Sequence, residues 1–228
     1  GSFSKLNGGI TTGDDNFFYI TRDTIDKFSI DEKDVYPVLK TQKDLKFIGI
    51  RSSDKFLFSC RTHPNEIKDS KSYIYIKHGI ETNVNKGKNL ESMWYYQPCE
   101  SSAILIPRST YNRFGIHLNP NAIVFDNWAC GVKNDFYIFA YLNSIVNIYL
   151  MEVLGNSARG EGIRTFSLSM LINLPIIYSK ELRIEFNESF NEKDMIELAT
   201  NELRSLTAED IYKPTSIIER IDNFFLSA

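Results

Sequence analysis

Cysteines and histidines are too few and too scattered in this sequence to build the common catalytic and metal sites. Cys60, Cys99 and Cys130 lie far apart without a CxxC pair, which excludes a disulfide framework and favours free thiols in a reducing compartment. The only metal-like spacing is Cys60-x-x-His63, and it lacks the second ligand pair of a structural zinc site. Three isolated histidines give no Ser-His-Asp or Cys-His set. The sequence therefore predicts no catalytic residue and no metal ligand.

A phosphate-binding loop is also missing. In GGITTGDDNFFYIT, residues 8–21, Gly8 and Gly13 have the spacing of a P-loop, but Asp14 and Asp15 stand where lysine and serine or threonine are required. Their carboxylates would repel a phosphate, and the G-x-G-x-x-G fingerprint does not occur either. Glycines that allow positive φ, followed by aspartates that satisfy local backbone groups, predict a tight turn into a strand.

The excess of acidic residues is concentrated at the C-terminal end. The formal net charge is −3, but residues 180–228 carry 6 basic and 11 acidic side chains, whereas residues 71–164 carry 9 and 7. A polyanion could therefore meet a neutral-to-basic face upstream. Residue 1 is glycine, and Gly-Ser is a common cloning remnant, so we expect residues 1–2 to be foreign and the chain to be a piece of a longer protein.

Short runs rich in aromatic and β-branched residues predict strands at 17–21, 46–50, 55–60 and 103–108, and a turn with a further strand at 117–126. Residues 67–81 favour a helix over an edge strand. The nearly continuous apolar run at 136–154, ended by Gly155-Asn156, predicts one long helix. Polar residues at its centre favour a buried core helix over a membrane span.

Two amphipathic segments follow this core. Behind an Asn191 cap, helical spacing relates Ile196, Ala199, Leu203 and Leu206, and a second segment repeats the pattern with Ile218, Ile221 and Phe225. The prediction is an α+β fold with a mainly antiparallel β core, a long buried helix and a C-terminal helical pair. We expect one main domain at 3–180 and an acidic helical segment at 181–228 that packs on it or docks on a catalytic part.

Two segments offer cations to a polyanion. The loop at 155–168, GNSARGEGIRTFSL, contains Ser157, Arg159 and Arg164, and guanidinium groups suit guanine edges and phosphates. The segment at 86–115 places Lys86, Lys88, Arg108 and Arg113 around the aromatic cluster Trp94, Tyr95 and Tyr96. Those rings fit either base stacking or a core strand, and a Gly/Arg loop fits either a binding site or a plain connection.

The order of these motifs resembles the target-recognition region of the γ-class N6-adenine DNA methyltransferases of type II restriction–modification systems, some of which carry a nuclease in the same chain. The most specific pieces are the TG-x-x-x-FF turn at 12–18, Leu142-Asn143-Ser144, and Leu174-Pro175-Ile176. The part from the long helix to Leu-Pro-Ile is also similar to target-recognition domains of type I specificity subunits. The resemblance spans Gly8 to Asp222.

This resemblance implies that the chain reads double-stranded DNA, without a cofactor of its own, in a prokaryotic cytoplasm. A separate N-terminal domain of the parent would bind S-adenosylmethionine and methylate an adenine flipped out of the duplex. Here the sequence Asn-Pro-Asn-Ala at 119–122 departs from the NPP-aromatic catalytic loop, so catalysis is not expected in this chain. The expected DNA contacts are Arg159, Arg164, Ser157, Arg108, Arg113, Lys86, Lys88 and Thr12. The alternative function is a specificity or scaffold module that acts mainly through contact with a separate catalytic subunit.

Overall fold

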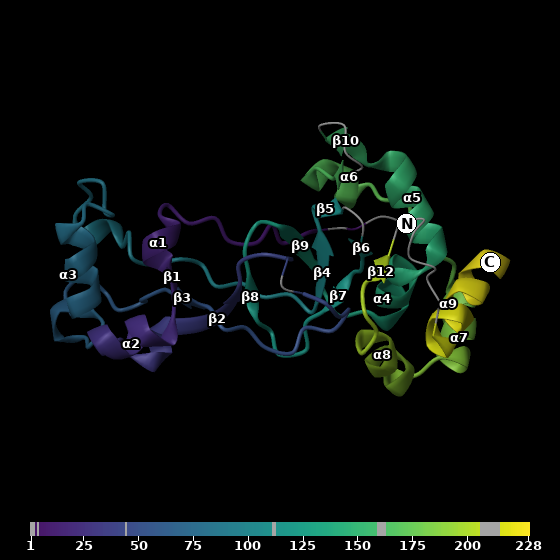
Figure 1. Ribbon diagram of the computed structural model, residues 1–228, viewed down its shortest axis with the longest axis horizontal. Helices are drawn as coiled ribbons and strands as arrows, with labels where there is room; N and C mark the ends of the chain where they lie inside the picture. Colours follow the sequence, from purple (N-terminus) through teal and green to yellow (C-terminus); the bar gives the residue numbers. More distant parts are fainter. Residues whose placement is uncertain (1–2, 4, 44, 111–112, 159–162, 206–214) are drawn as a thin grey trace.

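The computed structural model describes residues 3, 5–43, 45–110, 113–158, 163–205 and 215–228, and it confirms an α+β fold. Figure 1 shows an elongated molecule with α3 at one end and α7 and α9 at the other. The N-terminal lobe holds α1 (Asp15–Phe18), β1 (Tyr19–Ile20), α2 (Arg22–Phe28), η1 (Glu32–Asp34), β2 (Val35–Leu39), β3 (Phe56–Phe58), η2 (Ile67–Asp69), α3 (Tyr73–Glu81) and η3 (Leu90–Ser92).

The C-terminal lobe contains the remaining elements. They are β4 (Ile104–Pro107), β5 (Ser109–Thr110), β6 (Arg113–Phe114), β7 (His117–Leu118), β8 (Val124–Phe125), β9 (Ala129–Val132), α4 (Phe136–Asn143), α5 (Ile145–Leu154), β10 (Asn156–Ala158), β11 (Ile163–Thr165), α6 (Leu168–Ile172), α7 (Lys180–Ser189), α8 (Glu192–Ala199), β12 (Arg204–Ser205) and α9 (Ser216–Ser227). Strands predicted at 55–60, 103–108 and 117–126 are confirmed by β3, β4 and the pair β7 and β8, and α3 confirms a helix within 67–81.

The N-terminal lobe is a small sheet covered by aromatic side chains. Its strands run β1-β3-β2 in antiparallel order, and β8 from the other lobe adds to β2 in parallel. The expected strand at 17–21 begins two residues late, because the Asp14 carboxylate accepts hydrogen bonds from the backbone N–H groups of Asn16 and Phe17 and caps α1. The Phe17 ring then stacks on Tyr75 with a centroid distance of 4.6 Å in the core of this lobe.

The C-terminal lobe is built around the antiparallel sheet β7-β4-β9. All four residues of β4 and all four of β9 are buried, and α4 packs in the same core together with α7, α8 and α9. A strand that is buried on both faces reads as a continuous apolar run, which is why β4 was visible in the sequence.

The run at 136–154 forms two helices instead of the single predicted helix. α4 ends at Asn143, and α5 starts after Ser144, whose hydroxyl accepts a hydrogen bond from Asn147 N and caps the new helix. The two axes differ by 65°. Among the described residues no single helix has the length and apolarity to cross a membrane, and this bent pair passes that test by length and composition only.

A buried amide lies directly before the break. Asn143 accepts a hydrogen bond from Ile116 N at 3.0 Å, and its Nδ2 donates to the carbonyl oxygens of Ile116 and Phe139 at 3.1 and 3.0 Å. The side chain therefore satisfies both backbone groups of Ile116, next to the short strands β6 and β7. Asn143 thus connects the end of α4 to the segment between β6 and β7, and the Ser144 cap starts the new helix directly after it.

The predicted helical pair, α8 and α9, packs on α4 of the main body, and α7 is a further helix that the sequence analysis did not predict. Ile218, Ile221 and Phe225 of α9 are buried, as expected. In α8 the capping box of Asn191 and Asp194 is present, but Ile196 is 55% exposed, and Met195 and Leu198 are buried instead. The predicted stripe is wrong at Ile196, because α8 packs Met195 and Leu198 against the core. Leu203 is buried, but α8 ends at Ala199 and Leu203 packs from an extended segment beyond the helix. Leu206 lies outside the described residues.

Replacing Asn143 by alanine should lower the free energy of unfolding by roughly 3 kcal/mol, because both backbone groups of Ile116 lose their partner in a buried site. The matched control is Asn173→Ala, which removes an exposed side-chain hydrogen bond to Ser169 O and should cost less than about 1 kcal/mol. Urea denaturation measures both changes. Equal losses in the two variants would contradict the role of Asn143.

Candidate nucleic-acid interface

A cleft of about 600 Å³ lies where the β2–β3 connection meets the C-terminal lobe. Its described lining is Thr41, Gln42, Lys43 and Leu45 from that connection, Ser109, Thr110 and Arg113 from β5 and β6, and Trp128, Ile163 and Leu203. Apolar side chains form the walls, and polar and basic side chains from two different segments stand among them. The described lining contains no aspartate or glutamate, and Asp44 lies outside the described residues.

One wall of the cleft is a three-stranded sheet that gathers distant parts of the chain. β11 pairs antiparallel with both β10 and β5, so that Arg164 lies opposite Ser157 on one side and Thr110 on the other. Phe166 N donates to Arg108 O at 2.8 Å and extends this pairing. The predicted loop after the long helix and the predicted segment around Arg108 are therefore neighbours in space.

The opposite wall is held by residues 46–50, which cross from the N-terminal lobe into the C-terminal lobe. Ile48 N donates to Asn201 O at 2.8 Å and Gly49 N to Ala199 O at 2.7 Å. On the other side, Leu118 N donates to Ile48 O, and Ile50 N donates to Leu118 O. The expected strand at 46–50 is thus an extended segment that joins β7 to the residues after α8 through isolated bridges.

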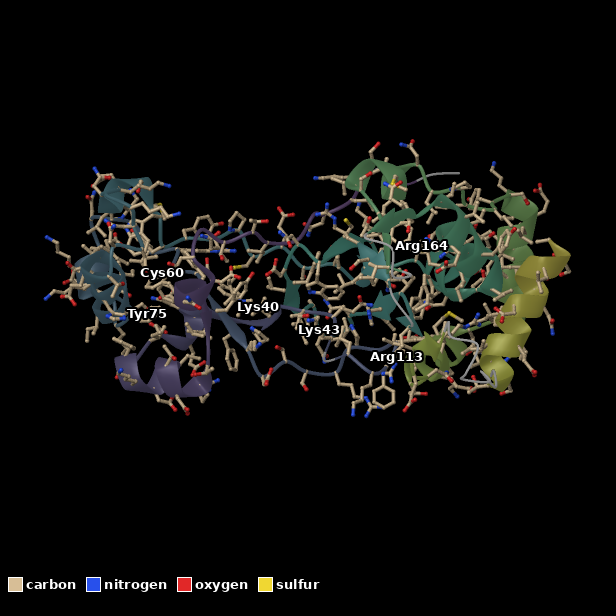
Figure 2. All side chains as sticks on the ribbon, turned by 45° about the horizontal axis from the view of Figure 1, so that its top comes forward. Lys40, Lys43, Cys60, Tyr75, Arg113 and Arg164 are labelled. Carbon is tan, nitrogen blue, oxygen red and sulfur yellow. The ribbon has the colours of Figure 1, made fainter. Side chains whose placement is uncertain are left out.

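The longer stretch that contains this crossing, residues 40–55, is the crossing segment, and it carries five basic residues. We call them the basic ridge: Lys40, Lys43, Lys46, Arg51 and Lys55. Lys43 and Arg113, both labelled in Figure 2, line the main cleft. Lys46 and Arg51 line an adjoining cleft of about 180 Å³, and Lys40 and Lys55 line another of about 260 Å³. The ridge was not among the predicted DNA contacts, although lysines at every third position from 40 to 46 were visible in the sequence.

The basic residues at the cleft differ in their ion pairs. Lys40 pairs with Asp15 at 3.1 Å and lies over the Tyr19 ring at 4.6 Å. Within the part of the chain that the structure describes, Lys43, Lys46 and Arg113 have no ion pair. An anion that approaches the cleft would therefore meet three cations that pair with no described carboxylate.

The predicted arginines near the cleft have different surroundings. Arg113 is exposed at the rim, and Arg108 donates from Nη1 to Asn127 O at 3.4 Å. The Arg164 side chain is 29% exposed, and its Nε contacts Glu152 Oε2 at 3.2 Å. Because neighbouring residues of a strand face opposite sides, Arg164 points toward α5 while Ile163 points to the cleft. Ser157 is exposed on β10, and Arg159 lies outside the described residues.

The other predicted contacts lie on the N-terminal lobe, apart from this cleft. Lys86 and Lys88 are in the turn after α3, and Lys86 Nζ donates to Gly13 O at 3.5 Å. Thr12 donates to the Asp15 carboxylate next to the α1 cap. The structure therefore brings Thr12 and Lys86 together at a second location, separate from Arg108, Arg113 and Arg164.

The aromatic cluster at 94–96 belongs mainly to the core. Trp94 is 8% exposed and its ring packs 5.5 Å from Phe17, while Tyr95 is fully buried. Gly79 of α3 makes room for the indole, because a Cβ there would come within 2.6 Å of the Trp94 and Phe17 rings. Of the two interpretations of Trp94, the core position is confirmed, and its ring is not available for base stacking.

Neither metal-type clusters nor reactive thiols mark this region. Among the described residues no group of three or more His, Cys, Asp or Glu side chains has the arrangement of a metal site. Burial raises the pKa of the Cys60, Cys99 and Cys130 thiols. Such thiols are protonated near neutral pH and are poor nucleophiles and ligands.

Comparisons with known proteins place this fold. No family model and no curated protein sequence matches the chain. The fold resembles parts of solved structures, among them a restriction endonuclease and a restriction–modification enzyme. The type IIG restriction endonuclease BpuSI matches 96% of this chain with a TM-score of 0.58 and 12% sequence identity. The type IIL restriction–modification enzyme MmeI, solved in complex with DNA, matches 99% with a TM-score of 0.59 and 15% identity. The chain spans 29% and 35% of the length of these two proteins.

A buried histidine behind the cleft should make the fold sensitive to acid. His117 of β7 is fully buried against Trp128, and burial lowers its pKa from 6.5 to about 4. The unfolded chain then binds a proton at a higher pH than the folded chain, so stability is unaffected above about pH 7 and falls as the pH drops from 6.5 toward 4. At pH 5 the loss from this residue is about 2 kcal/mol.

The variant His117→Phe should lose this part of the pH dependence, whereas the exposed-site control His63→Gln should keep it. Urea denaturation at pH 7 and pH 5 gives the difference in unfolding free energy for each protein. If His117→Phe showed the same difference in unfolding free energy between pH 7 and pH 5 as the unmutated chain, the assignment of acid sensitivity to this histidine would be wrong.

Proposed function

We propose that this chain is a double-stranded DNA recognition domain of a site-specific adenine-N6 DNA methyltransferase of a restriction–modification system. The observation that carries the proposal is the cleft rimmed by Lys43 and Arg113, on a fold shared with parts of two restriction–modification enzymes. One of these neighbours was solved with DNA, which supports the DNA part of the proposal. Adenine methylation and the use of S-adenosylmethionine are implied by the sequence resemblance. Both would be carried out by a separate N-terminal domain of the parent protein.

The basic ridge and Arg113 would bind the phosphates of the duplex. Cations that are free of internal ion pairs can release counterions from DNA on binding, and this release makes affinity fall with salt. Arg108 and Ser157 lie on the same sheet wall, and with Arg159 and Arg164 they stay predicted contacts to bases or phosphates. Arg164 would have to exchange Glu152 for the DNA.

Removing Lys43 and Arg113 together, as Lys43→Ala with Arg113→Ala, should weaken duplex binding and reduce the slope of log affinity against log salt by about 2, because each lost phosphate contact contributes about 0.9. Fluorescence anisotropy with a labelled duplex over a salt series measures both quantities. The control is Lys193→Ala, an exposed lysine on α8 outside the cleft, which should change neither. An unchanged salt slope in the double variant would remove the cleft from the DNA interface.

A second candidate function, a module that works through protein contacts, is favoured by one surface. α5 exposes Ile145, Tyr149 and Val153 at a spacing of four residues, with Tyr149 69% and Val153 62% exposed. In a helix this spacing forms one continuous apolar stripe. A catalytic domain of the parent would be the partner of this stripe.

The two functions separate in one pair of measurements. Tyr149→Ser with Val153→Ser should weaken binding of the chain to the parent's catalytic domain and leave duplex affinity unchanged. Isothermal titration calorimetry with that domain and anisotropy with duplex DNA provide the comparison. If the catalytic domain binds the double variant as tightly as it binds the unmutated chain, the stripe has no docking role.

A further inference from the structure

Trp128 lines the main cleft and is held in place by contacts of its own. Trp128 Nε1 donates to Leu39 O at 2.9 Å, and the ring meets His117 edge-to-face with centroids 5.9 Å apart. The indole also packs on the small apolar cluster between the lobes, together with Leu45. Since its polar atom is already satisfied, what Trp128 offers to the cleft is apolar ring surface.

Three polar side chains stand around this surface. The side chains of Gln42, Lys43 and Arg113 line the cleft, and none of them hydrogen bonds or forms an ion pair with another described residue. Gln42 has both an amide donor and an amide acceptor, and the other two are cations. An occupant that satisfies all of them is flat and apolar on its faces, has donors and acceptors on its edge, and carries a negative charge beside it.

We propose that the cleft binds a single nucleobase displaced from the DNA stack, with its flanking phosphate between Lys43 and Arg113. The inference rests on the proposed function and adds the ligand class for this cleft. Stacking on an aromatic side chain accepts any base, because every base has a π-face, and an edge amide such as that of Gln42 suits adenine. A volume of about 600 Å³ lies in the range of sites that enclose one small ligand.

Intact duplex cannot use the cleft in this way. A paired base is covered on both faces by its neighbours and reaches Trp128 only after it leaves the stack, at a cost that is smallest for an unpaired or mismatched base. A preference for duplex with one unpaired nucleotide is therefore the signature of the cleft. Binding through the basic ridge alone would treat paired and bulged duplexes alike.

The experiment compares three probes by fluorescence anisotropy and competition: a fully paired duplex, the same duplex with one bulged adenine nucleotide, and free dAMP. We expect the bulged duplex to bind at least about tenfold more tightly than the paired duplex, and free dAMP to bind far more weakly, because it lacks the contacts of the duplex to the ridge. Equal affinity for the two duplexes would overturn the base site and leave the proposed function standing. If neither duplex binds, both fail. If dAMP binds as tightly as the bulged duplex, the cleft is a mononucleotide site and the inference is wrong.

A blocking variant links the preference to the cleft. Ser109 is exposed on β5 at the cleft wall, and Ser109→Phe should abolish the preference for the bulged duplex, with the paired-duplex affinity of the same variant as the reference. Gln42→Phe blocks the same space from the opposite wall and serves if the first variant does not fold. The control Ser189→Phe places the same ring on the exposed end of α7 and should keep the preference. A tenfold preference that survives both blocking variants would assign it to another surface.

Discussion

The main-chain hydrogen bonds of residues 46–50 hold the two lobes together and create the cleft between them. This segment leaves the N-terminal lobe after β2, pairs with Leu118 on one side and with Ala199 and Asn201 on the other, and returns to β3. Gly49 is required at the crossing, because a Cβ there would come within 2.7 Å of Ala199 O. Both the apolar cluster between the lobes and the basic ridge depend on this close approach.

Local signals in the sequence predicted the elements that are stabilised locally. Runs such as 103–108 are buried on both faces, and the caps at Asn191 and the turn before Phe17 act within a few residues. The break after Asn143 was not predictable from helical periodicity, because it lies inside a continuous apolar run, where Ser144 caps a second helix and Asn143 binds the distant backbone of Ile116. The position of Ile196 also follows from tertiary packing, which selected a different face of α8.

The candidate site was predicted in part for the same reason. The sequence pointed to Arg108, Arg113 and Arg164 as members of basic or glycine-rich segments, and the fold brings the strands that carry them together. It gave no sign that residues 40–46 would face Arg113, because that contact depends on the crossing between the lobes. Lys86 and Thr12 were grouped with these residues by charge and motif order alone, and the fold places them on the other lobe.

The division of charge along the chain is also a division in space. In the C-terminal segment, Arg183 pairs with Asp135, Arg204 with Asp222 and Arg220 with Asp194, so its three arginines are already paired with carboxylates of the chain. Of its other acidic residues, Glu181, Glu185 and Glu188 lie on α7 and Glu219 lies on α9. Figure 1 shows these two helices at the end of the molecule opposite α3. Such a charge distribution orients an approaching polyanion toward the middle of the molecule.

Residues 40–55 pass from the N-terminal lobe to the C-terminal lobe and back, and this path restrains the movement of the lobes. The lobes are joined by several connections: the crossing segment, the residues around Ile10, and the chain that follows Tyr95. Rotation about a single hinge is therefore blocked. The spacing between the backbone segments that carry Lys43 and Arg113 is then fixed by the protein. In the proposed function the DNA would adapt its groove to this span, and sequences that bend or unstack at low cost would gain an advantage without any contact to their bases.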